Sequence, residues 1–152
     1  MLEKDSHDDL SVPNSIKQSA YNWCLRYRSL FEEIESDEAV KTSLKKYSGY
    51  TRPTENLGLI KVLHNCMHKA YESGVVIPGY GYIIETAGLA EEAVFEPTPE
   101  WAESLTDDQL LACIAWHFRR DYFNNGSWIS NSVANGYMLI LVRNFLEKYQ
   151  SV

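Results

Sequence analysis

The chain has 152 residues, 45% of them hydrophobic and 23% charged, and a net charge of −7. This length and composition predict one globular domain with its own core. The negative charge argues against non-specific binding to nucleic acid or to an anionic membrane.

The first residues, MLEKDSHDDLS, are charged and lack the apolar region of a secretory signal. Their acidic residues also differ from a mitochondrial transit peptide. No apolar run approaches the roughly 20 residues that cross a bilayer. We therefore expect a cytoplasmic protein with no membrane contact, a disordered tail over residues 1–12 and a single globular domain over 13–152.

Three apolar periodic segments predict the first helices. Residues 15–36 carry apolar side chains at three- and four-residue steps, with Asn14 or Ser15 as the helix cap. A shorter helix is expected from about Asp37 to Tyr47. Thr54 can cap a third helix, which should end at Gly74.

The segment VVIPGYGYIIET, near residues 75–86, predicts a small β-hairpin, because β-branched and aromatic residues flank a Pro-Gly turn. Residues 86–101 are expected to form mostly a loop. Pro78 would confine the hairpin to an edge.

Clear start and stop signals mark the helices after this loop. Thr98 followed by Pro99 predicts a short helix through Ser104, and Thr106 with Gln109 forms a capping box for the next helix. Asn125-Gly126 and Asn135-Gly136 predict left-handed caps, which leave a short helix over 128–134 and a final one over 137–149. The expected fold class is mainly α (α+β), a compact bundle of five to seven helices with the one hairpin.

The three cysteines, Cys24, Cys66 and Cys113, lie within apolar periodic segments. Their number is odd and no CxxC pair occurs. We therefore expect reduced, buried thiols rather than disulfides.

The stretch HFRRDYFNNGSW, residues 117–128, contains the densest group of reactive side chains. At helical spacing, Asp121 falls on the apolar face, where a carboxylate needs a partner or a function. It could accept backbone hydrogen bonds from the following Asn-Gly turn or pair with an arginine. It could also lie beyond the helix end, or be a functional carboxylate beside His117.

Two pairs at i, i+4 spacing raise the possibility of a metal site. They are His64 with His68 and His117 with Asp121, and together they could supply four ligands in a helical bundle. However, no HExxH motif is present, and such pairs are common on amphipathic helices. No P-loop, GxGxxG or GxSxG motif occurs either, so we expect no metal and no cofactor.

The same stretch also resembles a small nucleic-acid-binding patch, made of Arg119, Arg120, Tyr122, Phe123, Asn124 and Trp128. Only two of these side chains are cations, and their surroundings are acidic. The aromatics could equally pack in the core while the arginines pair with nearby acids. A nucleic-acid partner is therefore not expected.

The last 45 or so residues resemble the C-terminal motif of a family of small uncharacterised microbial proteins, a domain of unknown function. The motif reads aromatic-x-Arg-x-Asp/Glu-x-Phe-x-x-Gly, followed by a second glycine and a leucine-rich helix. It is carried here by Phe118, Arg120, Asp121, Phe123, Gly126 and Gly136. The resemblance implies that Arg120, Asp121, Phe123 and Gly126 act as a unit, and it implies no catalytic residue.

The sequence favours a non-enzymatic, acidic protein that binds another macromolecule, an inhibitor or adaptor of bacterial or phage type. Enzyme motifs are absent and the chain has ten tyrosines, a residue enriched in interfaces. Tyr47, Tyr50, Tyr80 and Tyr82 are the tyrosines expected at the surface. The predicted binding residues are Arg119, Arg120, Asp121, Tyr122, Trp128, Tyr80 and Tyr82.

Two alternatives remain. One is a metal-dependent or hydrolytic enzyme that uses His64, His68, His117 and Asp121. The other is an acidic mimic of nucleic acid, which would need one face to carry Asp37, Glu38, Glu91, Glu92, Glu96, Asp107 and Asp108.

Overall fold

A computed structural model describes residues 11–46, 57–121 and 127–150 of the chain, and this part is mainly α-helical. The described part of the chain contains nine helices and no strand. The helices are α2 (Asn14–Glu35), α3 (Glu38–Lys45), α4 (Leu57–Glu72), α5 (Tyr80–Ala87), α6 (Glu91–Phe95), α7 (Pro99–Glu103), α8 (Asp107–Arg120), α9 (Ser127–Ala134) and α10 (Tyr137–Gln150). The prediction of a mainly α fold is confirmed, whereas the hairpin and the count of five to seven helices are wrong.

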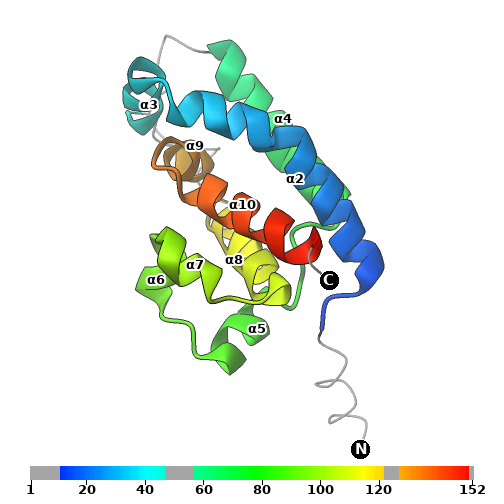
Figure 1. Ribbon diagram of the computed structural model, residues 1–152. Coiled ribbons are helices and arrows are strands. Elements are labelled where there is room, and N and C mark those ends of the chain that lie inside the picture. Colours follow the sequence, from blue (N-terminus) through cyan, green and yellow to red (C-terminus); the bar gives the residue numbers. More distant parts are fainter. Residues whose placement is uncertain (1–10, 47–56, 122–126, 151–152) are drawn as a thin grey trace, which may run out of the picture.

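The helices pack in layers around α8 and α10 (Figure 1). α10 packs against both α2 and α8, and α5 also packs against α8. α4 runs beside α2, and α3 packs against α9. The short helices α6 and α7 lie at the same end of the molecule as α5 (Figure 1).

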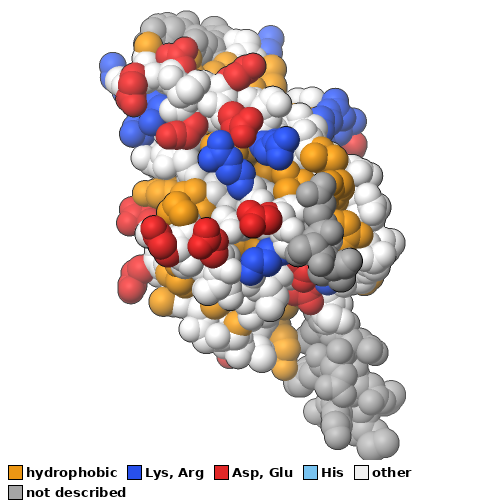
Figure 2. Space-filling model, in the orientation of Figure 1, with side chains coloured by type: hydrophobic (Ala, Val, Ile, Leu, Met, Phe, Trp, Pro, Cys, Tyr) orange, Lys and Arg blue, Asp and Glu red, His pale blue; other side chains and the backbone are white. Residues whose placement is uncertain are grey.

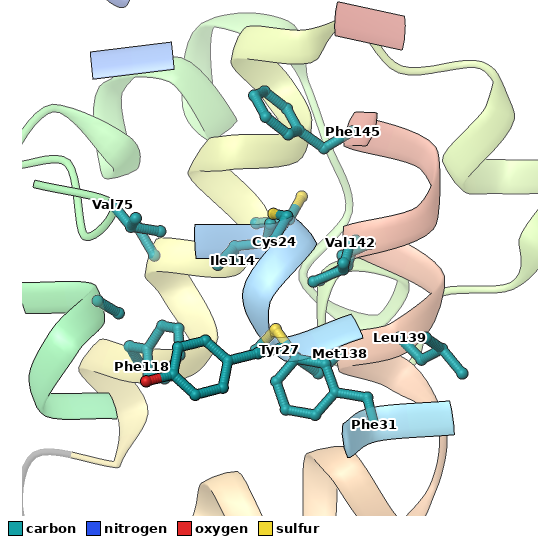
Figure 3. Packing of buried hydrophobic residues seen from close by; sticks show 14 of the residues in the cluster. Cys24, Tyr27, Phe31, Val75, Ile114, Phe118, Met138, Leu139, Val142 and Phe145 are labelled. Carbon is teal, nitrogen blue, oxygen red and sulfur yellow. The ribbon is translucent and has the colours of Figure 1, made fainter. Parts of the chain in front are cut away.

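The central position of α8 explains its composition. Every residue from Leu110 to Phe118 is buried, so this helix has apolar side chains on nearly all sides. Side chains from α2 and α10 complete the core, among them Phe31, Met138 and Phe145 (Figure 3). Cys24, Cys66 and Cys113 are all free and buried, as predicted.

Several helix ends follow the predicted signals. The Thr98 side chain accepts a hydrogen bond from the Trp101 N–H, and Thr106 and Gln109 form both bonds of the capping box. Gly136 has a φ of +81°, the left-handed conformation expected after α9. α2 differs, because its first helical residue is Asn14 and Pro13 takes the cap position. Thr54 and Asn125-Gly126 lie outside the described residues.

The segment predicted to be a hairpin forms α5 instead. Tyr80, Ile83 and Ile84 share a helical face and pack against the core, which outweighs the strand propensity of their side chains. Pro78 precedes the helix, where it removes no helical hydrogen bond, and Gly88 ends it with a φ of +67°. The predicted loop at 86–101 is also partly helical, since it contains α6.

The start of α2 is tied to the start of α8. Val12, which the sequence assigned to the tail, is buried, and its N–H donates to Asp108 Oδ2 at 3.3 Å. Lys17 Nζ lies 3.2 Å from Asp107 Oδ2 and 2.9 Å from Asp108 Oδ1. The two acids in the first turn of α8 therefore bind Val12 and Lys17, and their negative charges also interact favourably with the positive end of the helix dipole.

The end of α10 closes the bundle. Lys148 Nζ donates to the carbonyl oxygens of Glu103 and Leu105, in and just after α7. The Tyr149 hydroxyl donates to Asn14 Oδ1 at 3.1 Å, which joins α10 to the first turn of α2. The end of α10 is thus bound both to α7 and to the first turn of α2.

Candidate functional site: the His117 cleft

His117 lies in the last turn of α8 and is fully buried. Its Nε2 is 2.8 Å from the Val94 carbonyl oxygen on α6, and its Nδ1 is 3.1 Å from Ser132 Oγ on α9. Because a carbonyl oxygen can only accept, we assign the ring proton to Nε2, and the Ser132 hydroxyl then donates to Nδ1. One imidazole therefore connects three helices.

Burial lowers the pKa of His117 to about 4, although the hydrogen bond to Val94 partly opposes this shift. The imidazole is therefore neutral at physiological pH, with both nitrogens occupied by bonds within the protein. A histidine held in this way is a weak proton acceptor, because its protonated form is strongly disfavoured.

His117 forms part of the floor of a cleft of about 360 Å³ between α6, α8, α9 and the start of α10. We call it the His117 cleft. Its volume falls within the range of small-ligand pockets. Its lining residues are Phe95, Glu96, His117, Ser127, Trp128, Asn131, Ser132, Asn135 and Tyr137.

One wall of the cleft is aromatic. The rings of Phe95 and Trp128 are stacked, with centroids 5.1 Å apart and an interplanar angle of 29°. Trp116 packs edge-on behind Trp128 at 5.9 Å. Phe95 is 42% exposed, so this wall reaches the molecular surface.

The rim is rich in hydrogen-bond acceptors. Asn131 Nδ2 donates to the Ser127 carbonyl oxygen, and Asn135 Nδ2 donates to that of Asn131, both at 2.9 Å. The NH₂ group of each amide therefore donates to a helix carbonyl oxygen, and the amide oxygen remains as an acceptor. Burial raises the pKa of Tyr137. The negative charge of Glu96 and the hydrogen bond between the two side chains raise it further. Tyr137 thus stays protonated beside the Glu96 carboxylate.

Asp121 lies just outside this cleft and follows α8 as its C-terminal cap. It is 2% exposed, and its Oδ1 accepts a hydrogen bond from the Ile129 N–H at 3.1 Å. Ile129 is in the first turn of α9, whose N–H groups have no partner within the helix. The buried carboxylate therefore caps the next helix, α9, while the Asn-Gly turn predicted to bind it lies outside the described residues.

The two arginines before Asp121 are exposed. Arg120 Nη2 is 3.0 Å from Glu91 Oε1, and its guanidinium lies 4.7 Å from the centroid of the Trp116 ring. Arg120 thus joins α8 to α6 at the edge of the aromatic wall. Arg119 is on the surface of the same turn and does not line the cleft.

The structure does not bring the predicted metal ligands together. His117 is buried, whereas His68 is exposed on α4 and lies 2.8 Å from Glu72. In the described part of the chain, no three His, Cys, Asp or Glu residues are placed to hold a metal ion. His64, His68, His117 and Asp121, all of which are described, therefore form no such group.

The other predicted binding residues are dispersed. Tyr80 and Tyr82 are on α5, where Tyr82 is 40% exposed and Tyr80 packs partly on the core. Among the described residues predicted to bind a partner, Trp128 alone lines the His117 cleft. Tyr122, like Tyr47, Tyr50, Phe123 and Asn124, lies outside the described residues.

Most cleft residues were not predicted from the sequence. Ser127, Asn131 and Asn135 recur at i, i+4 spacing and so share one face of α9, which is a signal for a polar helix face. Phe95 and Glu96 gave no such signal, because their segment was expected to be a loop. Only the packing of α6 on α8 places them beside His117.

No family model, no curated protein and no solved structure matches this chain. The resemblance of the last 45 residues to a domain of unknown function stays a prediction. Among the described helices, none is both long enough and apolar enough to span a membrane.

Proposed function

We propose that the protein is a non-enzymatic binding protein, and that its macromolecular partner inserts a basic side chain into the His117 cleft. The observation that carries this proposal is the composition of the cleft. It combines a carboxylate and two amide oxygens with an aromatic wall, and none of the described Lys or Arg residues lines it.

An arginine or lysine side chain complements these features. The guanidinium or ammonium group can donate to the Glu96 carboxylate and to the side-chain oxygens of Asn131 and Asn135. Its alkyl part and its charge are both compatible with the faces of Phe95 and Trp128, through apolar contact and cation–π attraction. A buried Arg against an aromatic pocket is also a common centre of binding energy in interfaces.

The surrounding charge supports a cationic partner. Between Ala70 and Phe118 the sequence has nine acidic residues and no Lys or Arg. Figure 2 shows acidic side chains gathered on the side of the molecule that carries α6 and α7. Such a field attracts a basic partner before contact and speeds its association.

A hydrolytic function is less well supported. Ser132 and His117 form the pair closest to a nucleophile with its base. Ser132 is only 3% exposed, and a histidine with a pKa of about 4 has little tendency to take its proton.

Mimicry of nucleic acid is also less well supported, because the acidic residues that it requires are on α3, α6 and α8 or their caps. Most of them already have partners within the protein, among them Glu38 with Lys41 and Glu91 with Arg120. Asp37 caps α3, and Asp107 and Asp108 bind Lys17. This pairing does not favour a row of phosphate-like charges on one face.

The proposal can be tested with short model peptides. We expect an arginine-containing tripeptide with blocked ends to shift the NMR signals of Trp128, Asn131 and Asn135 in a saturable way. The citrulline analogue, which has the same shape without the charge, should bind at least about tenfold more weakly. Equal binding of the two peptides, or shifts elsewhere only, would overturn the proposal.

A matched pair of variants identifies the carboxylate involved. Glu96→Gln should weaken arginine-peptide binding about tenfold, whereas Glu85→Gln should leave it unchanged. Glu85 is an exposed acid on α5 that does not line the cleft. If both variants weakened binding equally, the effect would come from net charge and not from the cleft.

A further inference from the structure

A second cavity, of about 350 Å³, lies between α2 and the end of α4. We call it the α2–α4 cavity. The residues from α2 recur at three- and four-residue steps and so form one face of that helix. The lining residues are Ser19, Asn22, Trp23, Arg26, Tyr27, Lys69, Glu72 and Ser73.

This cavity is rich in hydrogen-bond donors, in contrast to the His117 cleft. The Asn22 amide oxygen accepts from Gln18 Nε2 at 3.3 Å, which leaves its NH₂ group as a donor. The Arg26 guanidinium lies 5.3 Å from the centroid of the Tyr27 ring, and it forms no ion pair with any residue that the structure describes. Five N–H donors of this side chain thus remain without a carboxylate in the described chain.

Among the described residues, one carboxylate lines the cavity, and it is already neutralised. Glu72 lies 3.3 Å from Lys69 Nζ and 2.8 Å from His68 Nε2. Arg26 therefore gives the cavity a net positive charge, in a chain whose overall charge is −7.

The Tyr27 hydroxyl is the second, independent sign of a ligand. Tyr27 is 5% exposed, and its hydroxyl is buried without a hydrogen-bond partner among the described residues. A buried polar group in this situation is rare and calls for an explanation. Burial raises the pKa of Tyr27, so the hydroxyl is a donor at neutral pH, and the charges of Arg26 and Lys69 both act on it.

We propose that the α2–α4 cavity binds a small molecule through an oxyanion, either a phosphate or a carboxylate group. Arg26 would form paired hydrogen bonds to two oxygens, while Lys69 stays paired with Glu72. Asn22, Ser19 and the Tyr27 hydroxyl supply further donors, while the Trp23 ring offers an apolar surface to the rest of the molecule. This site shares no lining residue with the His117 cleft and does not depend on the function proposed for it.

The test uses inorganic phosphate and acetate as separate probes in NMR titrations at constant ionic strength. We expect at least one anion to produce saturable shifts at Asn22, Arg26, Lys69 and Ser73. The anion with the higher affinity indicates whether the natural ligand carries a phosphate or a carboxylate. Shifts that do not saturate with either anion, or that are spread over the whole surface, would overturn the proposal.

Two neighbouring arginines provide a matched comparison. Arg26→Met should lower the affinity for the preferred anion about tenfold or more. Arg28→Met should not change it, because Arg28 is exposed on α2 but does not line the cavity. Equal losses would show general screening rather than a site.

Tyr27→Phe separates a ligand-binding hydroxyl from a structural defect. Removing a buried hydroxyl without a partner should raise the melting temperature of the anion-free protein. The same substitution should weaken anion binding, so stability and affinity change in opposite directions. Unchanged affinity would overturn the role of Tyr27, while the Arg26 comparison still tests the site itself.

Discussion

His117 donates from Nε2 to the Val94 carbonyl oxygen, 2.8 Å away, and this bond holds the five-residue helix α6 against the centre of the bundle. Val94 is itself fully buried. Phe95, which belongs to the aromatic wall, and Glu96 directly follow Val94 in the sequence, so this contact helps to fix their positions in the cleft. A buried neutral histidine thus places the residues proposed to bind the partner.

The first prediction concerns pH. The folded protein keeps His117 neutral down to about pH 4, whereas the unfolded chain protonates it below about pH 6.5. The free energy of unfolding therefore has its full value, as far as His117 is concerned, above pH 6.5. It falls by about 3 kcal/mol in total as the pH is lowered towards 4. Urea denaturation at several pH values measures it.

His117→Gln is the matched control for this effect, because its amide can still donate to Val94 but does not titrate. The variant should lose less stability than the wild type between pH 6.5 and 5. Parallel pH profiles would mean that other groups cause the loss.

A second prediction concerns the cap on α9. Asp121→Ala removes the acceptor for the buried Ile129 N–H, and we expect it to lower the free energy of unfolding by about 1–3 kcal/mol. Asp121→Asn retains Oδ1 as an acceptor and should cost less.

Arg120→Ala is the comparison for Asp121, since the side chains of Arg120 and Glu91 are 49% and 73% exposed. An exposed ion pair of this kind contributes at most about 1 kcal/mol. If Arg120→Ala destabilised the protein as much as Asp121→Ala, the two residues would be a coupled unit, as the resemblance to the uncharacterised family implies.

The third prediction contrasts two glycines. Gly136 has a φ of +81°, so Gly136→Ala should destabilise the protein by roughly 1–2 kcal/mol through backbone strain. Gly58 is exposed in α4, and an added Cβ there meets no atom within 4 Å. Gly58→Ala should therefore stabilise the protein by about 0.4–1 kcal/mol. Thermal denaturation of the two variants should show melting temperatures that move in opposite directions.

The fourth prediction concerns the thiols. Cys24, Cys66 and Cys113 are buried, and burial raises the pKa of each, that of Cys113 to about 12. Neutral, inaccessible thiols do not react with disulfide reagents. We expect modification by a chromogenic disulfide only at the rate at which the structure opens, with an increase in mild urea. Rapid labelling of any cysteine in the native protein would contradict its buried position.

The sequence predicted those features that depend on local signals. The Thr106–Gln109 capping box and the glycine cap at Gly136 were correct because each is decided by a few neighbouring residues. Helical spacing also placed Asp121 on the apolar face, and its side chain is buried, although the residue follows α8 as its cap.

Features that depend on distant contacts could not be predicted. Residues 80–87 have strand-forming side chains, and they become a helix because Ile83 and Ile84 reach the core against α8. The His117 cleft likewise joins residues 95 and 137, which have no relation in the sequence. For the same reason, local spacing of His64 and His68 suggested a metal site that the packing does not form.

The position of α10 has a consequence for how the protein folds during synthesis. The Tyr149 hydroxyl binds Asn14, a residue 135 positions earlier, and α10 packs against both α2 and α8. Since translation proceeds from the N-terminus, the inner faces of α2 and α8 stay uncovered until α10 has left the ribosome. The nascent chain therefore exposes the faces of α2 and α8 that later pack on α10, and protection of these faces by chaperones should matter until α10 is made.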